Sequence, residues 1–286
     1  MQITFPQAEN QTCEGPLVVS AQEHLDIIGR HCTTIVGDLG FNETYTGPFV
    51  LRNVQNITGS LMAVFWKQES IANRRVQYVD RLDFLFSPAL VNVSAPKLEI
   101  ANGVWVAQVP EDSEAHFPVL RDVSYLVFRG NYSGIEVPGL RNVTGLLRIE
   151  HGNITNNHPL SVSLASMEYV SRFVVSGKIV SISAPKLETN GELTSLPWID
   201  MPSLRNTESK ITMKSTTPLN ISLPLESWPQ FLGFFGAIEQ LAFPNIEGFV
   251  RVRIESGLPL HCAVLDRFFK PIVANITDVK WETQDT

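Results

Sequence analysis

The chain has few cysteines and few charged residues. Only three of its 286 residues are cysteines, too few to form the several bridges of a disulfide-rich scaffold. Charged residues make up 18%, and the formal net charge of -7 is dispersed without a basic cluster. Proteins that bind nucleic acids need grouped lysines and arginines to displace counterions. The composition therefore argues against a nucleic-acid partner.

Long hydrophobic runs are also missing. The longest strongly apolar stretch, residues 231–238, is far shorter than the roughly 20 residues that span a bilayer. The first residues lack the basic start and apolar run of a signal peptide, and the last residues lack the pattern of a lipid-anchor signal. We therefore expect secretion to depend on a leader, and membrane attachment on an anchor, that this sequence does not contain.

What the sequence does contain is a short phrase that returns about every 22 residues. It reads apolar-x-x-apolar and is often followed by glycine. Its eleven rows begin at Cys32, Val54, Val76, Leu98, Leu120, Leu140, Met167, Leu187, Leu204, Leu225 and Ile246. A period in this range is typical of a solenoid, in which each unit buries its apolar edge on its neighbours.

Within each row the pattern is that of strands and turns. Apolar residues alternate with polar ones, as in Val250 to Ile254, and proline recurs two residues before a row, as at Pro96 and Pro138. The phrase Ser-Ala-Pro-Lys-Leu-Glu occurs at residues 94–99 and again at 183–188, about four coils later. We therefore predict a mostly β protein, a single parallel β-helix or leucine-rich-like solenoid of about 10–11 coils. The longer step between Leu140 and Met167 predicts a loop near residues 153–158, and a second insertion is expected near 110–116.

The ends of the solenoid are predicted from different signals. Ser20 and Glu23 form a capping-box pattern, so a short capping helix is expected between Cys13 and Cys32, and a Cys13–Cys32 disulfide would hold it over the first coil. Cys262 has no evident partner and is expected to be a buried free thiol. We predict a disordered leader at 1–12, a solenoid at 13–280 with caps at 13–32 and 258–270, and a tail at 281–286.

Asparagines indicate the compartment. Nine of the seventeen lie in Asn-x-Ser/Thr, whereas chance placement predicts roughly two or three. These N-glycosylation acceptors are Asn10, Asn42, Asn56, Asn92, Asn131, Asn142, Asn153, Asn220 and Asn275. The excess predicts an extracellular glycoprotein.

Several phrases together resemble one family. Residues 12–15, the capped helix, residues 32–39 and 138–145, and the ending at 261–268 are similar to fungal GPI-anchored cell-wall organisation proteins, whose repeats are similar to receptor L domains. The resemblance implies a right-handed, heavily glycosylated β-solenoid at the cell surface or in the cell wall, needed for wall integrity. The chain departs from the family by lacking a second late cysteine; Lys280 and Trp281 lie in that neighbourhood.

Parallel β-helices include polysaccharide-degrading enzymes, so a catalytic role has to be tested against the residues. Such an enzyme needs paired carboxylates on neighbouring coils. The candidates are Asp80 with Asp83, then Glu111, Asp112 and Glu114, and finally Glu136 with Glu150. We expect the first pair to be a solvated strand edge beside Arg81, and the second group to be an exposed acidic loop. That loop lacks the glycine turn and oxygen spacing of a calcium site.

No other chemistry is indicated. The six histidines show no tight metal-ligand spacing, and the nucleophile, phosphate and dinucleotide motifs are missing from the sequence. We therefore expect no catalytic residue, no metal and no cofactor. A sugar-binding face would need outward aromatic rings, for which Trp66, Trp105, Trp198 and the phenylalanines of 231–235 are candidates, although most occupy core positions of the repeat. Trp105 is the best outward candidate for a glycan contact, provided that Val104 and Val106 point inward.

The sequence thus favours a non-enzymatic extracellular glycoprotein that contributes to fungal cell-wall organisation and integrity. Its expected partners are cell-wall polysaccharides or wall proteins. The first alternative is a receptor-like module that binds a wall glycan or a peptide. A more distant alternative is a polysaccharide-degrading β-helix.

Overall fold

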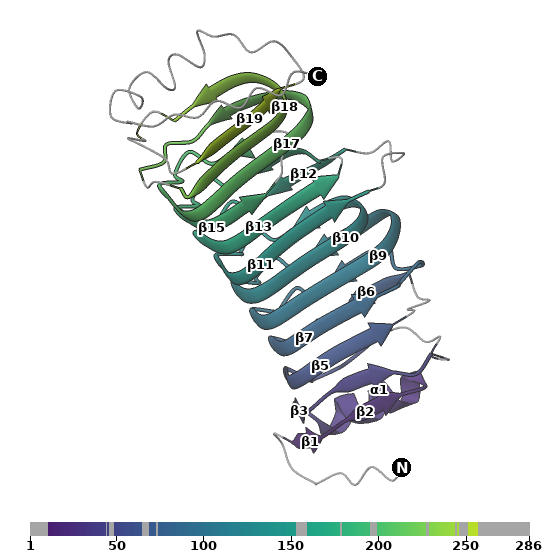
Figure 1. The fold of residues 1–286 in the computed structure, drawn as a ribbon. Coiled ribbons are helices and arrows are strands. Elements are labelled where there is room, and N and C mark those ends of the chain that lie inside the picture. Colours follow the sequence, from purple (N-terminus) through teal and green to yellow (C-terminus); the bar gives the residue numbers. More distant parts are fainter. Residues whose placement is uncertain are drawn as a thin grey trace.

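The computed structural model describes residues 11–43, 45, 49–64, 69–72, 74–152, 159–177, 179–194, 199–226, 229–243, 245 and 251–256. It is an elongated stack of coils (Figure 1). Most of the described residues are in strands, which are parallel and form a β-solenoid of about nine turns, and the described part contains one helix. The fold class predicted from the period is therefore confirmed. The last of the predicted rows, at Ile246, lies outside the described residues.

The elements follow one another along the stack. They are β1 (Thr12–Glu14), β2 (Leu17–Val19), α1 (Gln22–His31), β3 (Thr34–Val36), β4 (Leu39–Phe41), β5 (Asn56–Val64), β6 (Ser70–Ala72), β7 (Tyr78–Leu85), β8 (Asn92–Ser94), β9 (Ile100–His116), β10 (Asp122–Glu136), β11 (Asn142–His151), β12 (Leu160–Ser163), β13 (Tyr169–Gly177), β14 (Ile179–Ser183), β15 (Thr189–Thr194), β16 (Ile199–Asp200), β17 (Asn206–Ser222), β18 (Phe231–Ala242) and β19 (Val252–Ser256).

In-register parallel pairing converts the sequence period into buried columns. Residues one period apart lie directly above one another, about 4.8 Å apart. The longest column joins Leu17, Leu39, Leu61, Leu82, Val104, Leu126, Leu147, Phe173, Leu193, Ile211, Leu232 and Val252. The side chains from Leu17 to Phe173 in this column, together with those of Ile211 and Leu232, are at most 4% exposed. Each such burial contributes about 1.5–3 kcal/mol to stability, so the stack is held by its aligned apolar edges.

The proline-containing corners are tight turns. The backbone N–H of Leu98 donates to the carbonyl of Ala95 at 3.2 Å, and that of Leu140 donates to Val137 at 3.1 Å, with Pro96 and Pro138 at the second turn position. Proline suits this position because its φ is already fixed near the required value. The duplicated phrase at 183–188 forms the same turn, with Leu187 donating to Ala184 at 3.1 Å. The predicted role of proline is thus confirmed.

The N-terminal cap is the predicted short helix, but it begins later than its capping box suggests. Helix α1 runs Gln22–His31, its N-cap is Ala21, and no side chain caps it. The capping-box prediction is therefore wrong: Ser20 lies one residue before the cap, and its hydroxyl lies 3.4 Å from Nδ1 of His24 instead. Leu25 and Ile28 are buried against the first coil, as the helical spacing predicts.

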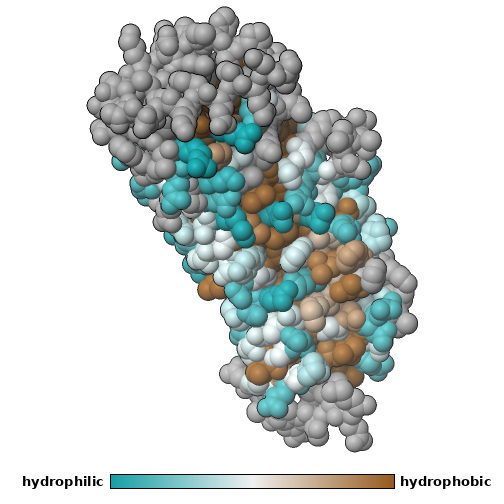
Figure 2. Space-filling view, viewed as in Figure 1, coloured by the Kyte–Doolittle hydropathy of each residue, from teal (hydrophilic) through white to brown (hydrophobic). Residues whose placement is uncertain are grey.

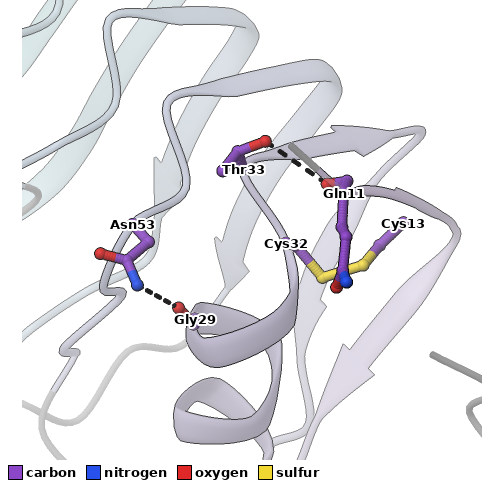
Figure 3. The surroundings of a disulfide bond; sticks show 6 residues. All are labelled: Gln11, Cys13, Gly29, Cys32, Thr33 and Asn53. Carbon is purple, nitrogen blue, oxygen red and sulfur yellow. Dashed lines mark hydrogen bonds between the residues drawn. A yellow bond between two sulfur atoms is a disulfide. The ribbon is translucent and has the colours of Figure 1, made fainter. Parts of the chain in front are cut away.

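Figure 3 shows two of the bonds that fasten this helix to the solenoid. Cys13 of β1 and Cys32, at the C-terminal end of α1, form the predicted disulfide, with 5.7 Å between their Cα atoms. On the other side, the Asn53 side-chain amide donates to the carbonyl of Gly29 at 2.8 Å (Figure 3). Both Cys13 and Cys32 are buried.

Other boundaries are described in part. Strand β1 begins at Thr12, within the segment expected to be a leader. Four predicted segments lie outside the described residues: residues 1–10, the C-terminal cap at 258–270 with Cys262, the tail at 281–286 and the loop at 153–158. The insertion expected near 110–116 is present: three residues separate Val109 from Ser113, where the next coil has one residue between Gly130 and Tyr132. No helix in the described part is long and apolar enough to span a membrane.

Candidate functional site

Several exposed apolar side chains lie on one side of the solenoid, on strands that face the reader in Figure 1. We call it the front face and define it as the outward side chains of residues 60–64, 81–85, 103–107, 125–129 and 146–150, in β5, β7, β9, β10 and β11. Hydrophobic residues gather there among hydrophilic ones (Figure 2). Met62, Val64, Trp105 and Tyr125 are exposed members of this face.

Trp105 has the orientation expected from the alternating pattern. Val104 and Val106 are buried, and Trp105 is 43% exposed on the opposite side of β9. Its register partners are Asp83 in the preceding coil and Val127 in the following one. The indole is therefore presented on the front face between two coils.

Tyr125 lies beside Trp105 and had no place in the sequence prediction. It is 53% exposed, and its register partner on β9 is Gly103, two residues before Trp105. Such diagonal neighbours in a sheet are about 7–8 Å apart, within reach of one extended ligand. Among the described residues, the ring contacts involve neither Trp105 nor Tyr125, so neither ring is stacked on another aromatic side chain.

The structure places Asp83 differently from the sequence prediction. The sequence predicts a solvated edge, yet the Asp83 side chain is only 6% exposed and accepts an ion-pair contact from Arg81 at 2.8 Å. Burial raises the pKa of Asp83. The positive charge of Arg81 lowers this pKa, and the negative charge of Asp80 raises it further. The physical reason is its position between Met62 and Trp105 in one column, where bulky neighbours from the adjacent coils exclude water. Arg81 remains half exposed above this buried carboxylate.

The two other arginines of the front face, Arg129 and Arg148, contact one carboxylate. Glu150 accepts contacts from Arg129 at 2.9 Å and from Arg148 at 2.8 Å. Further along, Lys210 lies 4.0 Å from Glu192. Exposed pairs of this kind contribute at most about 1 kcal/mol each to stability. Their effect on binding is clearer: they leave the face without a block of one charge sign.

The structure does not bring Glu136 and Glu150 together. Glu136 pairs with His116, whereas Glu150 pairs with arginines in a different set of columns. Glu111, Asp112 and Glu114 are exposed as expected, but they belong to strand β9 rather than to a loop. Among the described residues, no three histidines, cysteines or acidic residues are placed to hold a metal ion.

Other aromatic candidates are placed differently. Phe234 is buried in the core, as the repeat predicts. The rings of Phe231 and Phe235 have cations over them, Lys210 and Arg253 respectively, each at 5.7 Å. Trp66 and Trp198 lie outside the described residues.

None of the glycosylation acceptors that the structure describes belongs to the front face as defined. Asn42 and Asn92 are exposed, and Asn56, Asn131 and Asn142 are half buried. Asn56 and Asn142 share one outward column at the start of β5 and β11, and Asn142 donates to Asp122 at 2.7 Å. Asn92 lies in a different set of columns, paired with Ser70 and Glu114, and Asn220 belongs to β17, paired with Gln240. Asn10, Asn153 and Asn275 lie outside the described residues.

Comparison with known proteins finds no matching family model, no matching curated protein and no matching solved structure. The relationship to fungal cell-wall proteins therefore stays a hypothesis drawn from the sequence.

Proposed function

We propose that this chain is a non-enzymatic extracellular glycoprotein that contributes to fungal cell-wall organisation at the cell surface. The observation that carries the proposal is the placement of the acceptor asparagines. All five with described side chains are on the outer surface, exposed or half buried, and none is in the apolar core. Each could carry a glycan without disturbing the buried columns.

The architecture supports a structural role. Every described coil is tied to the next by parallel pairing, and the first coil is covered by a disulfide-linked helix. A solenoid of this kind is a stiff rod, because each unit leans on both of its neighbours. Glycans on several of its sides would make the rod a hydrated spacer within a polysaccharide layer.

The role can be tested by deleting the gene in its own organism and measuring growth on a dye that binds wall polysaccharides. We expect deletion to increase dye sensitivity and the full-length gene to restore resistance. A variant with Leu147→Arg, which places a charge in the buried column, should fail to restore it. Unchanged dye sensitivity after deletion would contradict the proposed role.

Glycosylation itself has a direct test. The secreted protein should lose mass when treated with an amidase that removes N-linked glycans. Thr144→Ala removes the acceptor motif of Asn142 but leaves the Asn142 side chain in place, so it should shift the mass by one glycan only. A secreted protein with no mass change on amidase treatment would contradict the assignment of the acceptors.

The alternative function, a module that binds a wall glycan, is favoured by one observation of its own. Trp105 and Tyr125 are exposed side by side on a face that carries no described acceptor asparagine. A binding role and a structural role are compatible, because attachment to a polysaccharide would place the rod in the wall.

A further inference from the structure

Three side chains of the front face lie in a zigzag over adjacent coils. Arg81 on β7 and Tyr125 on β10 are the register partners of Gly103 on β9, and Trp105 lies two residues after Gly103. The Tyr125 ring leans towards β11, where a Cβ built at Gly145 would lie 3.1 Å from its Cε1. Because Gly103 has no side chain, the strand between the arginine and the tyrosine carries nothing that would separate them. A Cβ built there would meet only the Cγ of Arg81, at 3.6 Å. We call Arg81, Trp105 and Tyr125 the front-face triad.

We propose that the front-face triad binds a neutral, β-linked polysaccharide of gluco configuration. This inference rests on the proposed location at the cell surface and names the ligand class for the binding alternative. In such a sugar the ring substituents are equatorial, so both flat faces consist of C–H groups. Trp105 and Tyr125 present two apolar ring surfaces to two neighbouring sugar units. Arg81 supplies hydrogen-bond donors for the hydroxyls at the ring edge.

Charge on this face favours a neutral ligand. The buried Asp83 lies 2.8 Å from the Arg81 guanidinium, and Arg129 and Arg148 share the single carboxylate of Glu150, so the outward charged residues of the front face sum to +1. A phosphorylated or acidic polymer would need a cluster of uncompensated cations, whereas each arginine of the front face is in contact with a carboxylate. The paired guanidinium donates directionally and adds little net charge, which suits hydroxyl groups.

Access to the triad also favours a polymer. None of the described acceptor asparagines belongs to the front face as defined, and none is a register partner of Trp105 or Tyr125. The face is a continuous sheet surface rather than the closed pocket that a small free sugar would need. A long chain can lie across several coils and repeat the same weak contacts.

The experiment uses the secreted full chain, in its glycosylated form. Its retention is measured on particulate β-1,3-glucan, cellulose and chitin, with starch as the α-linked comparison, and soluble hexamers of the retained polymer are then titrated calorimetrically. We expect retention on at least one β-linked polymer, little on starch, and little change between low and high salt. The three β-linked arms distinguish a glucan from chitin as the source of the shared chemistry.

Variants then test the triad. Trp105→Ala should weaken binding at least tenfold, Tyr125→Ala several-fold, and Arg81→Lys measurably, because lysine lacks the planar guanidinium. Ile100→Ala is the matched control: it is on the same strand β9, is 43% exposed like Trp105, and lies outside the front face. It should bind as the wild type does. Thermal unfolding midpoints check that each variant is folded, and if Trp105→Ala does not fold, Tyr125→Ala decides.

Three outcomes would overturn the proposal. The first is wild-type binding to none of the β-linked polymers. The second is full retention of both the Trp105 and the Tyr125 variants. The third is a dimer that depends on Trp105, detected by sedimentation without any saccharide binding, which would assign the face to a second copy of the chain. These assays use isolated polymers, so a negative binding result would not contradict a deletion phenotype. Likewise, the lack of a deletion phenotype would not contradict binding to an isolated polymer.

Discussion

A hydrogen bond from the Asn53 side chain to the Gly29 carbonyl helps to join the second coil to the capping helix. The Asn53 amide donates to the Gly29 carbonyl at 2.8 Å, near the end of α1 where backbone carbonyls lack partners within the helix. Asn53 has a φ of 65°, a left-handed conformation that asparagine tolerates better than most residues. Its side chain and its backbone therefore both suit this contact.

Asn53→Ala should lower the free energy of unfolding by about 1–2 kcal/mol, through the lost hydrogen bond and the strained backbone of alanine at positive φ. Asn53→Gly loses only the hydrogen bond, so it should cost less. Urea unfolding of both variants measures the difference. Equal stability of the alanine variant and the wild type would show that the contact contributes nothing.

Gly29→Ala should destabilise the protein although alanine is the better helix former by about 1 kcal/mol. A Cβ at Gly29 would lie 2.7 Å from the Arg52 carbonyl oxygen and 3.0 Å from the Arg52 nitrogen, so the helix would have to move away from the second coil. We expect a net loss of about 1–3 kcal/mol by thermal or urea unfolding. Gly40→Ala is the control, because nothing lies within 4 Å of its added Cβ. A stabilised Gly29 variant would contradict the close packing of the helix.

Leu147→Ala and Leu146→Ala form a matched pair on one strand. Leu147 is fully buried in the longest column, whereas Leu146 is half buried on the front face. Deleting the Leu147 side chain should cost about 2–5 kcal/mol, and deleting the Leu146 side chain about 1 kcal/mol or less. Urea unfolding of the two variants is the measurement. Similar losses at both positions would mean that the register of this strand is different.

Asp83 should make stability depend on pH in an unusual direction. Burial raises its pKa in the folded state above the value of 3.8 for an exposed group, so the folded protein binds a proton where the unfolded chain has lost it. The contribution of Asp83 to the free energy of unfolding is then greatest below 3.8, and it is lost as pH rises through the folded-state pKa. The free energy of wild type minus that of Asp83→Asn should be larger at pH 4 than at pH 7. Urea unfolding at both values gives this difference, and a pH-independent result would place Asp83 in water.

How far the sequence carries the fold can be seen from Val104, Trp105 and Val106. The period identifies the coils and the alternation identifies the inward residues, so the orientation of all three could be predicted. Both signals depend only on residues close together in the chain or exactly one coil apart. The same local reasoning located the helix and its disulfide, but it placed the helix start at the wrong residue. Ser20 is a favourable N-cap by residue type, yet its hydroxyl lies beside His24 and the helix begins after Ala21.

Asp83 shows why the candidate site could not be derived in the same way. Its chain neighbours, Asp80, Arg81 and Leu82, suggest a charged surface edge. Its burial comes instead from Met62 and Trp105, each about one coil away, whose side chains lie on both sides of it. A signal was available, because the period aligns these three residues approximately. An uncertainty of one residue at a corner would, however, exchange the inner and outer faces.

The periodic sequence alone was enough to establish a stack of parallel coils, since apolar edges repeated every 22 residues can be buried together only by placing one coil on another. It could not decide which outward side chains lie next to each other. That depends on how many residues each corner and bulge takes up, as between Val109 and Ser113, and those counts set the lateral register of neighbouring coils. The three-dimensional packing therefore decided that Arg81, Trp105 and Tyr125 share one face and that Asp83 is buried beneath them.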